Sequence, residues 1–173
     1  MDAYVFVRDA DDATLGALQE LAGRADETGV RFASSISGAY DAFVAVQGDD
    51  LAAIEESVRV HVRGAGAVAT ETALVLPPVG PLGPIPKGMP PDEVEAFVRI
   101  TVEPGRAGDV LAALQGLTGF MGAAIIGGEF DILAEIGGAT FEDVAGTLLN
   151  ELHTIDGIAS SRSAFAHFEA PTT

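Results

Sequence analysis

The chain has 173 residues, of which 48% are hydrophobic, so it has enough apolar material for a packed core and is not a disordered chain. Its 26 acidic and 9 basic residues give a formal charge of −17. No stretch gathers the basic side chains that displace counterions from nucleic acid, so direct DNA binding is not expected. The absence of cysteine excludes disulfides, thiol nucleophiles and thiolate metal sites.

The amino-terminal residues Met1-Asp2-Ala3-Tyr4 carry no basic segment ahead of their apolar run, so a signal peptide is not expected. No apolar stretch approaches the roughly 18 residues that a membrane helix needs. We therefore expect a cytoplasmic protein without a membrane partner.

Residues 1–76 predict the order strand, helix, strand, strand, helix, strand. Runs rich in β-branched and aromatic residues predict the strands Tyr4–Val7, Val30–Ser37, Ala42–Val46 and Val68–Leu76. The pairs Asp11-Asp12 and Asp49-Asp50 are typical of helix N-caps. Helical spacing predicts the inward side chains Leu15, Leu18 and Ala22 in the first helix, and Leu51, Ile54, Val58 and Val62 in the second.

Seven of the nine prolines lie between Pro77 and Pro91. Proline cannot donate a backbone hydrogen bond, so this segment is expected to form neither helix nor sheet. The sequence therefore predicts a linker, 77–92, between a domain at 1–76 and a domain at 93–169.

The residues after the linker repeat the same order. Strands are expected at Ala96–Val102, Gly119–Ile126, Phe130–Ile136 and Ile158–Phe168. One helix is expected to start near Arg106 and the other at Thr140, where Thr140-Phe141-Glu142-Asp143 resembles a capping box.

The two halves also match residue by residue. Residues 15–23 and 111–119 are identical at six of nine positions, and Gly38-Ala39-Tyr40-Asp41 matches Gly128-Glu129-Phe130-Asp131 at an offset of 90. The offset continues through the second helix and into the last strand, which predicts a duplicated unit.

A βαββαβ order predicts an α+β fold in which each half is a ferredoxin-like unit, with both helices on one face of an antiparallel sheet. The strands are apolar at successive positions, which indicates that both faces are covered. We expect the two units to pack sheet to sheet as a pseudo-dimeric α+β barrel, since a bare face of several hundred Å² would forfeit on the order of ten kcal/mol.

Both halves resemble the effector-binding domain of the Lrp/AsnC family of regulators. The resemblance lies in the two Gly-x-aromatic-Asp turns at 38–41 and 128–131, and in Gly66-Ala67-Val68-Ala69-Thr70-Glu71-Thr72, which is similar to the family's Gly-Val-x-x-Thr-x-Thr ending. The second half departs from that ending at Ser160, Arg162 and Ser163.

The resemblance implies a sensor for a small molecule, an amino acid or related metabolite, that modulates transcription. Family regulators carry a helix-turn-helix before the first strand, which is not found here, so sensing without DNA contact is expected. The resemblance also implies a homo-oligomer, and a regulator with the same sensor domain is a candidate partner.

The resemblance places the ligand near the two turns. The candidate ligand-binding residues are Gly38, Tyr40, Asp41, Thr70, Thr72, Gly128, Phe130, Asp131, Ser160 and Arg162. Each also has a structural interpretation: the aspartates can stabilise their turns, the glycines can supply positive φ or close backbone approach, the aromatic rings can fill an interface, and the hydroxyls can be ordinary strand residues. Arg162, placed by the offset at Thr72, can form a rim salt bridge.

No cofactor or catalytic residue is expected. His61, His153 and His167 show no metal-ligand spacing. Two other functions stay open. One is a cofactor-independent monooxygenase or isomerase of the dimeric α+β-barrel type, which would need a cavity with a histidine and a carboxylate. The other is a purely structural assembly module.

Overall fold

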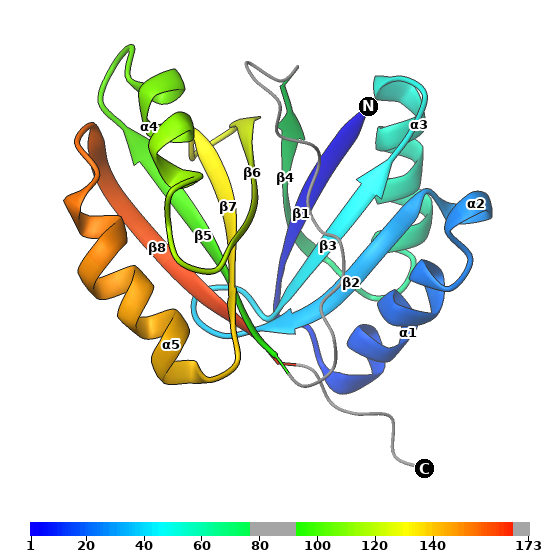
Figure 1. Cartoon of the computed structure of the whole chain (residues 1–173). Coiled ribbons are helices and arrows are strands. Elements are labelled where there is room, and N and C mark those ends of the chain that lie inside the picture. The colour runs from blue at the N-terminus through cyan, green and yellow to red at the C-terminus, as the bar shows by residue number, and fades with distance from the viewer. Residues whose placement is uncertain (77–92, 168–173) are drawn as a thin grey trace. The chain divides into compact units, whose positions relative to one another are not determined.

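The computed structural model describes residues 1–76 and 93–167 (Figure 1). They form two compact units: a first unit, Met1–Val75, and a second unit made of the described residues of Leu76–Ala166. The predicted linker 77–92 and Phe168 lie outside the described residues. Within the described ranges, no helix is long and apolar enough to cross a membrane.

The first unit has the predicted element order, with one short helix more. Its elements are β1 (Asp2–Arg8), α1 (Asp12–Ala22), α2 (Ala25–Thr28), β2 (Val30–Ile36), β3 (Ala42–Gln47), α3 (Leu51–Glu56), the π-helical continuation η1 (Ser57–Val62) and β4 (Ala69–Val75). All strand pairs are antiparallel, and the order across the sheet is β4-β1-β3-β2.

The second unit has the same order of strands, with no counterpart of α2 among its described residues and with an added 3-10 turn. Its elements are β5 (Val94–Val102), α4 (Ala107–Leu114), β6 (Phe120–Gly127), β7 (Ile132–Gly138), α5 (Phe141–Gly146), the π-helical η2 (Thr147–Glu151), the 3-10 turn η3 (Leu152–Thr154) and β8 (Ile158–His167). Its antiparallel strand order is β8-β5-β7-β6. The eight strands and their helices make an α+β protein.

The predicted helix caps are confirmed. Asp11 accepts a hydrogen bond from the Thr14 backbone N–H (2.8 Å), which lowers the pKa of Asp11. Asp50 accepts one from the Ala53 N–H (2.9 Å). At the start of α5, Thr140 and Asp143 each accept a hydrogen bond from the other's backbone N–H, the predicted capping box.

Each unit's helices cover one face of its sheet (Figure 1). Alternate residues of the central strands face them, such as Val5 beside Leu18 and Ile54 in the first unit. The intervening Tyr4 and Phe6 are buried as well, as expected for strands apolar at successive positions. One inward prediction is wrong: Leu51 is 54% exposed, because it is the first residue of α3 and lies at the end of the helix–sheet layer.

Each unit has a glycine with a left-handed backbone conformation just before its second strand, and we call this glycine the glycine joint. Gly29 and Gly119 have φ values of +73° and +74°. Each accepts a backbone hydrogen bond, Gly29 from Gln47 (2.7 Å) and Gly119 from Gly137 (2.8 Å). These two residues are related by the same offset of 90 as the two Gly-x-aromatic-Asp turns.

The offset changes by one in the last strand. The β5–β8 register shifts between Thr101 and Val102, after which Arg162 lies opposite Arg99. In the first unit Glu71 lies opposite Phe6, so Arg162 corresponds to Glu71. The prediction that Arg162 occupies the position of Thr72 is therefore wrong, since one inserted residue moves a strand position to the other face.

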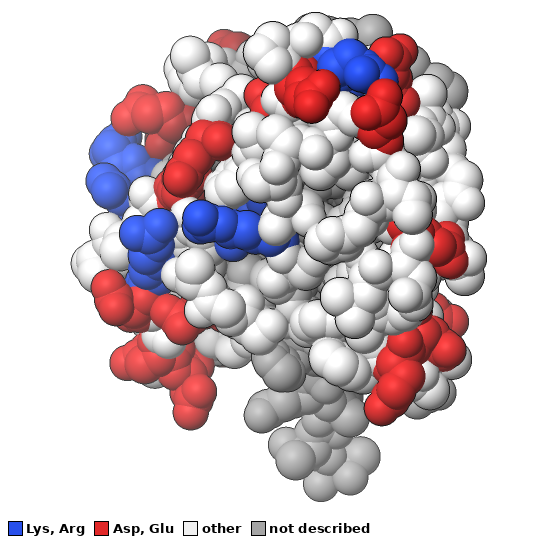
Figure 2. Space-filling view, turned by 90° about the vertical axis from the view of Figure 1, so that its left-hand side faces the viewer, with Lys and Arg blue, Asp and Glu red and all other residues white. Residues whose placement is uncertain are grey.

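Acidic side chains are spread over the surface. Figure 2 shows one side of the molecule, where Asp and Glu form several groups and the fewer basic side chains lie among or beside them. This distribution agrees with the formal charge of −17.

Candidate functional site

The turn aspartates both hold their turns. Asp41 Oδ2 accepts a hydrogen bond from the Ala10 N–H (3.3 Å), and Asp131 Oδ2 accepts one from the Val102 N–H (2.9 Å). Their own backbone N–H groups donate to Val7 and Ile100 in the neighbouring first strands of the two units. Each aspartate thus joins the β2–β3 or β6–β7 turn to the end of β1 or β5.

The aromatic residue of the first turn is the centre of a polar cluster. Tyr40 is buried, and its ring lies 5.2 Å from the Phe6 ring. The Arg8 guanidinium stands over the Tyr40 ring at 4.6 Å and donates to its hydroxyl (3.0 Å), which in turn donates to Glu71. Burial raises the pKa of Tyr40, and the bond to Glu71 raises it further, while Arg8 opposes the rise.

The second turn has a different partner for its aromatic ring. Phe130 is buried, and the Arg99 guanidinium lies 4.8 Å from its ring centre. Arg99 is only 4% exposed and directly opposes the exposed Arg162 on β8. A cation over an aromatic face therefore occurs at both turns, although the arginines come from different strand positions.

The predicted threonines lie on the other face of the sheet from Tyr40. Thr70 and Thr72 alternate with Glu71 on β4, so they face the helices while Glu71 faces Tyr40. They line a groove of about 460 Å³ between β4 and α3–η1. Arg63 Nε donates to Thr70 Oγ1 there (3.3 Å). The structure therefore separates these hydroxyls from the turn residues with which the sequence grouped them.

The other predicted residues lie near the turns or on β8. Gly38 has φ +104°, which explains glycine in that turn. Gly128 is not among the glycines with positive φ in the described residues. Ser160 is exposed on β8 opposite Thr101, on the same face as Arg162.

A buried carboxyl pair, not anticipated from the sequence, occurs in the second unit. Glu95 on β5 is 0% exposed and Glu135 on β7 is 1% exposed. Neither carboxyl oxygen of Glu95 has a hydrogen-bond partner of ordinary geometry among the described residues. Burial, with the neighbouring Glu135 carboxyl, raises the pKa of Glu95 from 4.5 to about 10. Glu95 therefore holds a proton at neutral pH.

A signal for this pair was present in the strand itself. Glu95, Phe97 and Arg99 occupy every second position of β5, so their side chains lie on the same face of the strand. Two of these three residues are ionisable, although most residues of the strand are apolar. The sequence pattern alone predicted only a strand rich in hydrophobic residues here. The partner Glu135 could not be assigned without the β5–β7 register, in which it opposes Phe97.

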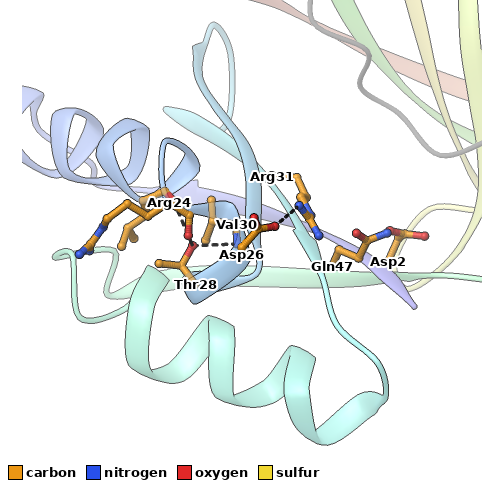
Figure 3. A network of polar contacts seen from close by, with 8 residues as sticks. Asp2, Arg24, Asp26, Thr28, Val30, Arg31 and Gln47 are labelled. Atoms are coloured by element: carbon orange, nitrogen blue, oxygen red, sulfur yellow. Dashed lines mark hydrogen bonds and ion pairs between the residues drawn. The ribbon is translucent and has the colours of Figure 1, made fainter.

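A polar hollow of about 730 Å³ lies in the first unit, where β2 starts and β3 ends. Its wall contains the ion pair Asp26–Arg31 (3.4 Å) (Figure 3). Thr28 anchors the chain beside it by donating to the Leu21 and Arg24 carbonyls and accepting from the Val30 N–H. These contacts fix the chain at the start of β2 beside the hollow.

No cluster of three or more His, Asp or Glu side chains placed to hold a metal ion occurs in the described part of the chain. His61 and His153 both lie in or after the π-helical turns, His61 in η1 and His153 in η3.

The comparisons with known proteins address the second unit directly. The family model described as the Lrp/AsnC ligand binding domain matches residues 95–169. This match contains the second Gly-x-aromatic-Asp turn, Arg99, Arg162 and the Glu95–Glu135 pair. Among curated proteins, no sequence matches this chain.

Two solved structures match nearly the whole chain in fold. One is the siroheme decarboxylase NirDL in complex with an iron-uroporphyrin III analogue. The match covers 96% of this chain and 70% of the NirDL chain, with a TM-score of 0.70 and 9% sequence identity. An anthrone oxidase-like protein matches 95% of this chain and 89% of its own with a TM-score of 0.54 at 13% identity. At these identities the likeness concerns the fold.

A transcriptional regulator matches a shorter part of the chain. The transcriptional regulator NMB0573 from Neisseria meningitidis, solved with L-Met, matches 46% of this chain and 53% of its own at 20% identity, with a TM-score of 0.40.

Proposed function

We propose that this protein is a small-molecule sensor or binding module of the Lrp/AsnC effector-domain type, built from two copies of one ferredoxin-like unit. Its ligand is an amino acid or a related metabolite, and its output is association with itself or with a regulator that has the same domain. The observation that carries the proposal is the match of residues 95–169 to the Lrp/AsnC ligand binding domain.

The copy relationship is supported by geometry as well as by sequence. The two units have corresponding strand orders and corresponding glycine joints at Gly29 and Gly119. We propose that the units act as a covalently joined pair, equivalent to a dimer of single domains. The predicted sheet-to-sheet packing belongs to this proposal.

An effect on transcription would then pass through a partner protein. The charge of −17 and the acidic groups on the surface oppose direct contact with phosphates. A partner with the same sensor fold is the simplest candidate, because strand and helix surfaces of one fold are suited to self-association.

A catalytic role is the second candidate, and a specific observation favours it. A buried carboxyl such as Glu95 that stays protonated at neutral pH is a group that enzymes use as a general acid. The whole-chain fold neighbours named siroheme decarboxylase and anthrone oxidase-like protein are compatible with such a role. Substrate turnover that is lost in Glu95→Gln would establish it.

The sensor proposal is tested by thermal unfolding of the full chain with each of the twenty amino acids and a set of simple carboxylates. A ligand at a hundred times its Kd adds about 2.7 kcal/mol, which raises the melting temperature by several degrees. Light scattering with and without the hit then measures assembly. A complete absence of shifts, together with an unchanged mass, contradicts the proposal.

A further inference from the structure

The groove beside β4 in the first unit combines an apolar floor with hydroxyls and guanidinium groups. Leu51, Ile54, Val58 and Leu74 provide the apolar surface, and Thr70 and Thr72 the hydroxyls. Its charged lining consists of Arg59, Arg63 and Glu55, so two guanidinium groups and one carboxylate lie at this groove.

The two arginines are differently engaged. Arg59 Nε lies 3.3 Å from Glu55 Oε1, an exposed i,i+4 pair that contributes little to stability. Arg63 uses its Nε to reach Thr70, and both arginines are exposed. A guanidinium has five N–H donors, so each arginine retains donors that a ligand carboxylate could use.

The same place in the second unit is built differently. Phe141 begins α5 as Leu51 begins α3, and Phe165 opposes Ala96 as Leu74 opposes Ala3. The Phe141 and Phe165 rings lie in contact, with centres 4.5 Å apart. The rings therefore occupy the position that is open between Leu51 and Leu74 in the first unit.

The arginines are also missing from the second unit. At the offset of 90, Leu149 and His153 stand where the first unit has Arg59 and Arg63. Leu149 is exposed, so the second unit offers apolar surface there in place of a guanidinium. The duplicated fold thus carries the open, cationic version of this groove in one unit and a closed version in the other.

We propose that the groove between β4 and α3–η1 binds a small carboxylate with a branched aliphatic side chain, with Arg63 and Arg59 on the carboxylate and Leu51 and Leu74 on the aliphatic part. Each chain holds one such site. This inference rests on the proposed small-molecule function and names the site and ligand class for it. The volume of about 460 Å³ accommodates a ligand of that size.

Methyl-labelled NMR of the full chain tests the site, with 4-methylpentanoate as the probe and 4-methylpentanamide as its uncharged counterpart. The carboxylate is expected to shift the methyl signals of Leu51, Ile54, Val58 and Leu74 to saturation at one probe per chain. The amide is expected to bind at least about tenfold more weakly, since it loses the charge-assisted hydrogen bonds.

Three variants locate the interaction. Arg63→Gln is expected to weaken carboxylate binding about tenfold or more, whereas Arg24→Gln, an exposed arginine of the same unit outside the groove, is expected to leave it unchanged. The double variant Leu51→Phe and Leu74→Phe copies the second unit and is expected to abolish binding. Because Leu51 is exposed and Arg63 lies at the surface, the melting temperature serves as the check that each variant folds.

Each contrary result has a distinct meaning. Saturable shifts at other methyl groups, or equal affinity for the amide and the carboxylate, overturn this site while the sensor proposal stands. The absence of any shift with the probe overturns the site and ligand class. Only the additional failure of the wider amino-acid and carboxylate screen overturns the sensor proposal itself.

Discussion

Glu95 and Glu135 face the same side of the second unit's sheet from neighbouring strands, and both carboxyl groups are buried. Two ionised carboxylates so placed would repel each other without water to screen them. The pair is therefore stable only while it holds a proton. This makes the carboxyl pair a pH-dependent element of the paired strands β5 and β7.

The pKa of Glu95, raised from 4.5 to about 10, sets the direction of the pH effect. The folded chain binds this proton more tightly than the unfolded chain, so the pair's favourable contribution is complete below pH 4.5 and is lost as pH rises toward 10. Glu95→Gln keeps a neutral group there. We expect urea unfolding to show that this variant gains stability over the wild type as pH rises. The exposed Glu20→Gln serves as the control, and an equal trend in both variants contradicts the assignment.

Tyr40 offers a spectroscopic test of its cluster, because the chain contains only two tyrosines. The hydrogen bond and the negative charge of Glu71 raise the pKa of Tyr40, whereas Arg8 lowers it. We expect Glu71→Gln to lower the pKa of Tyr40 and Arg8→Gln to raise it, measured by NMR of ring-labelled tyrosine. Unchanged titration in both variants means that the three side chains do not interact in solution.

Gly119 is expected to tolerate no side chain. A Cβ there would lie 2.0 Å from the Gly137 carbonyl oxygen, and φ is +74°. Gly119→Ala should lower the free energy of unfolding by at least about 2 kcal/mol. Gly108→Ala is the matched control, since a Cβ there meets nothing within 4 Å inside α4, and it should stabilise by about 0.5–1 kcal/mol. Chemical unfolding measures the free energy of unfolding of both variants. Equal changes in the two variants would contradict the requirement for glycine at position 119.

Local sequence signals predicted much of the fold because they depend on contacts between residues that are close in the chain. The Thr140 capping box and the Asp11 and Asp50 caps depend on contacts within four residues, and all three form. The element order followed from hydrophobic runs. Helix α2 was missed because Ala25–Thr28 is a single turn with no apolar face of its own.

The site was harder to predict because it depends on register. Thr70 and Thr72 were grouped with Tyr40, but strand alternation puts Glu71 on the tyrosine's face and the threonines in the groove. A register shift of one residue at Thr101 moved Arg162 from the predicted counterpart of Thr72 to that of Glu71. No run of sequence letters reveals such a shift, since it arises from the pairing of two strands.

Substitutions of Asp41 and Asp131 can distinguish a structural role of these turn aspartates from a role in ligand binding. Asp131 is partly buried and accepts a 2.9 Å hydrogen bond from Val102, whereas Asp41 is exposed and its bond to Ala10 is 3.3 Å long. Asp131→Ala should therefore cost about 1.5–3 kcal/mol of unfolding free energy, and Asp41→Ala less. Both Asp→Asn variants keep an accepting oxygen and should retain most of the stability.

If an Asn variant keeps its unfolding free energy but loses affinity for a ligand found in the thermal screen, the carboxylate contacts that ligand. If affinity survives in both Asn variants, the aspartates serve the turns alone and ligand recognition lies elsewhere.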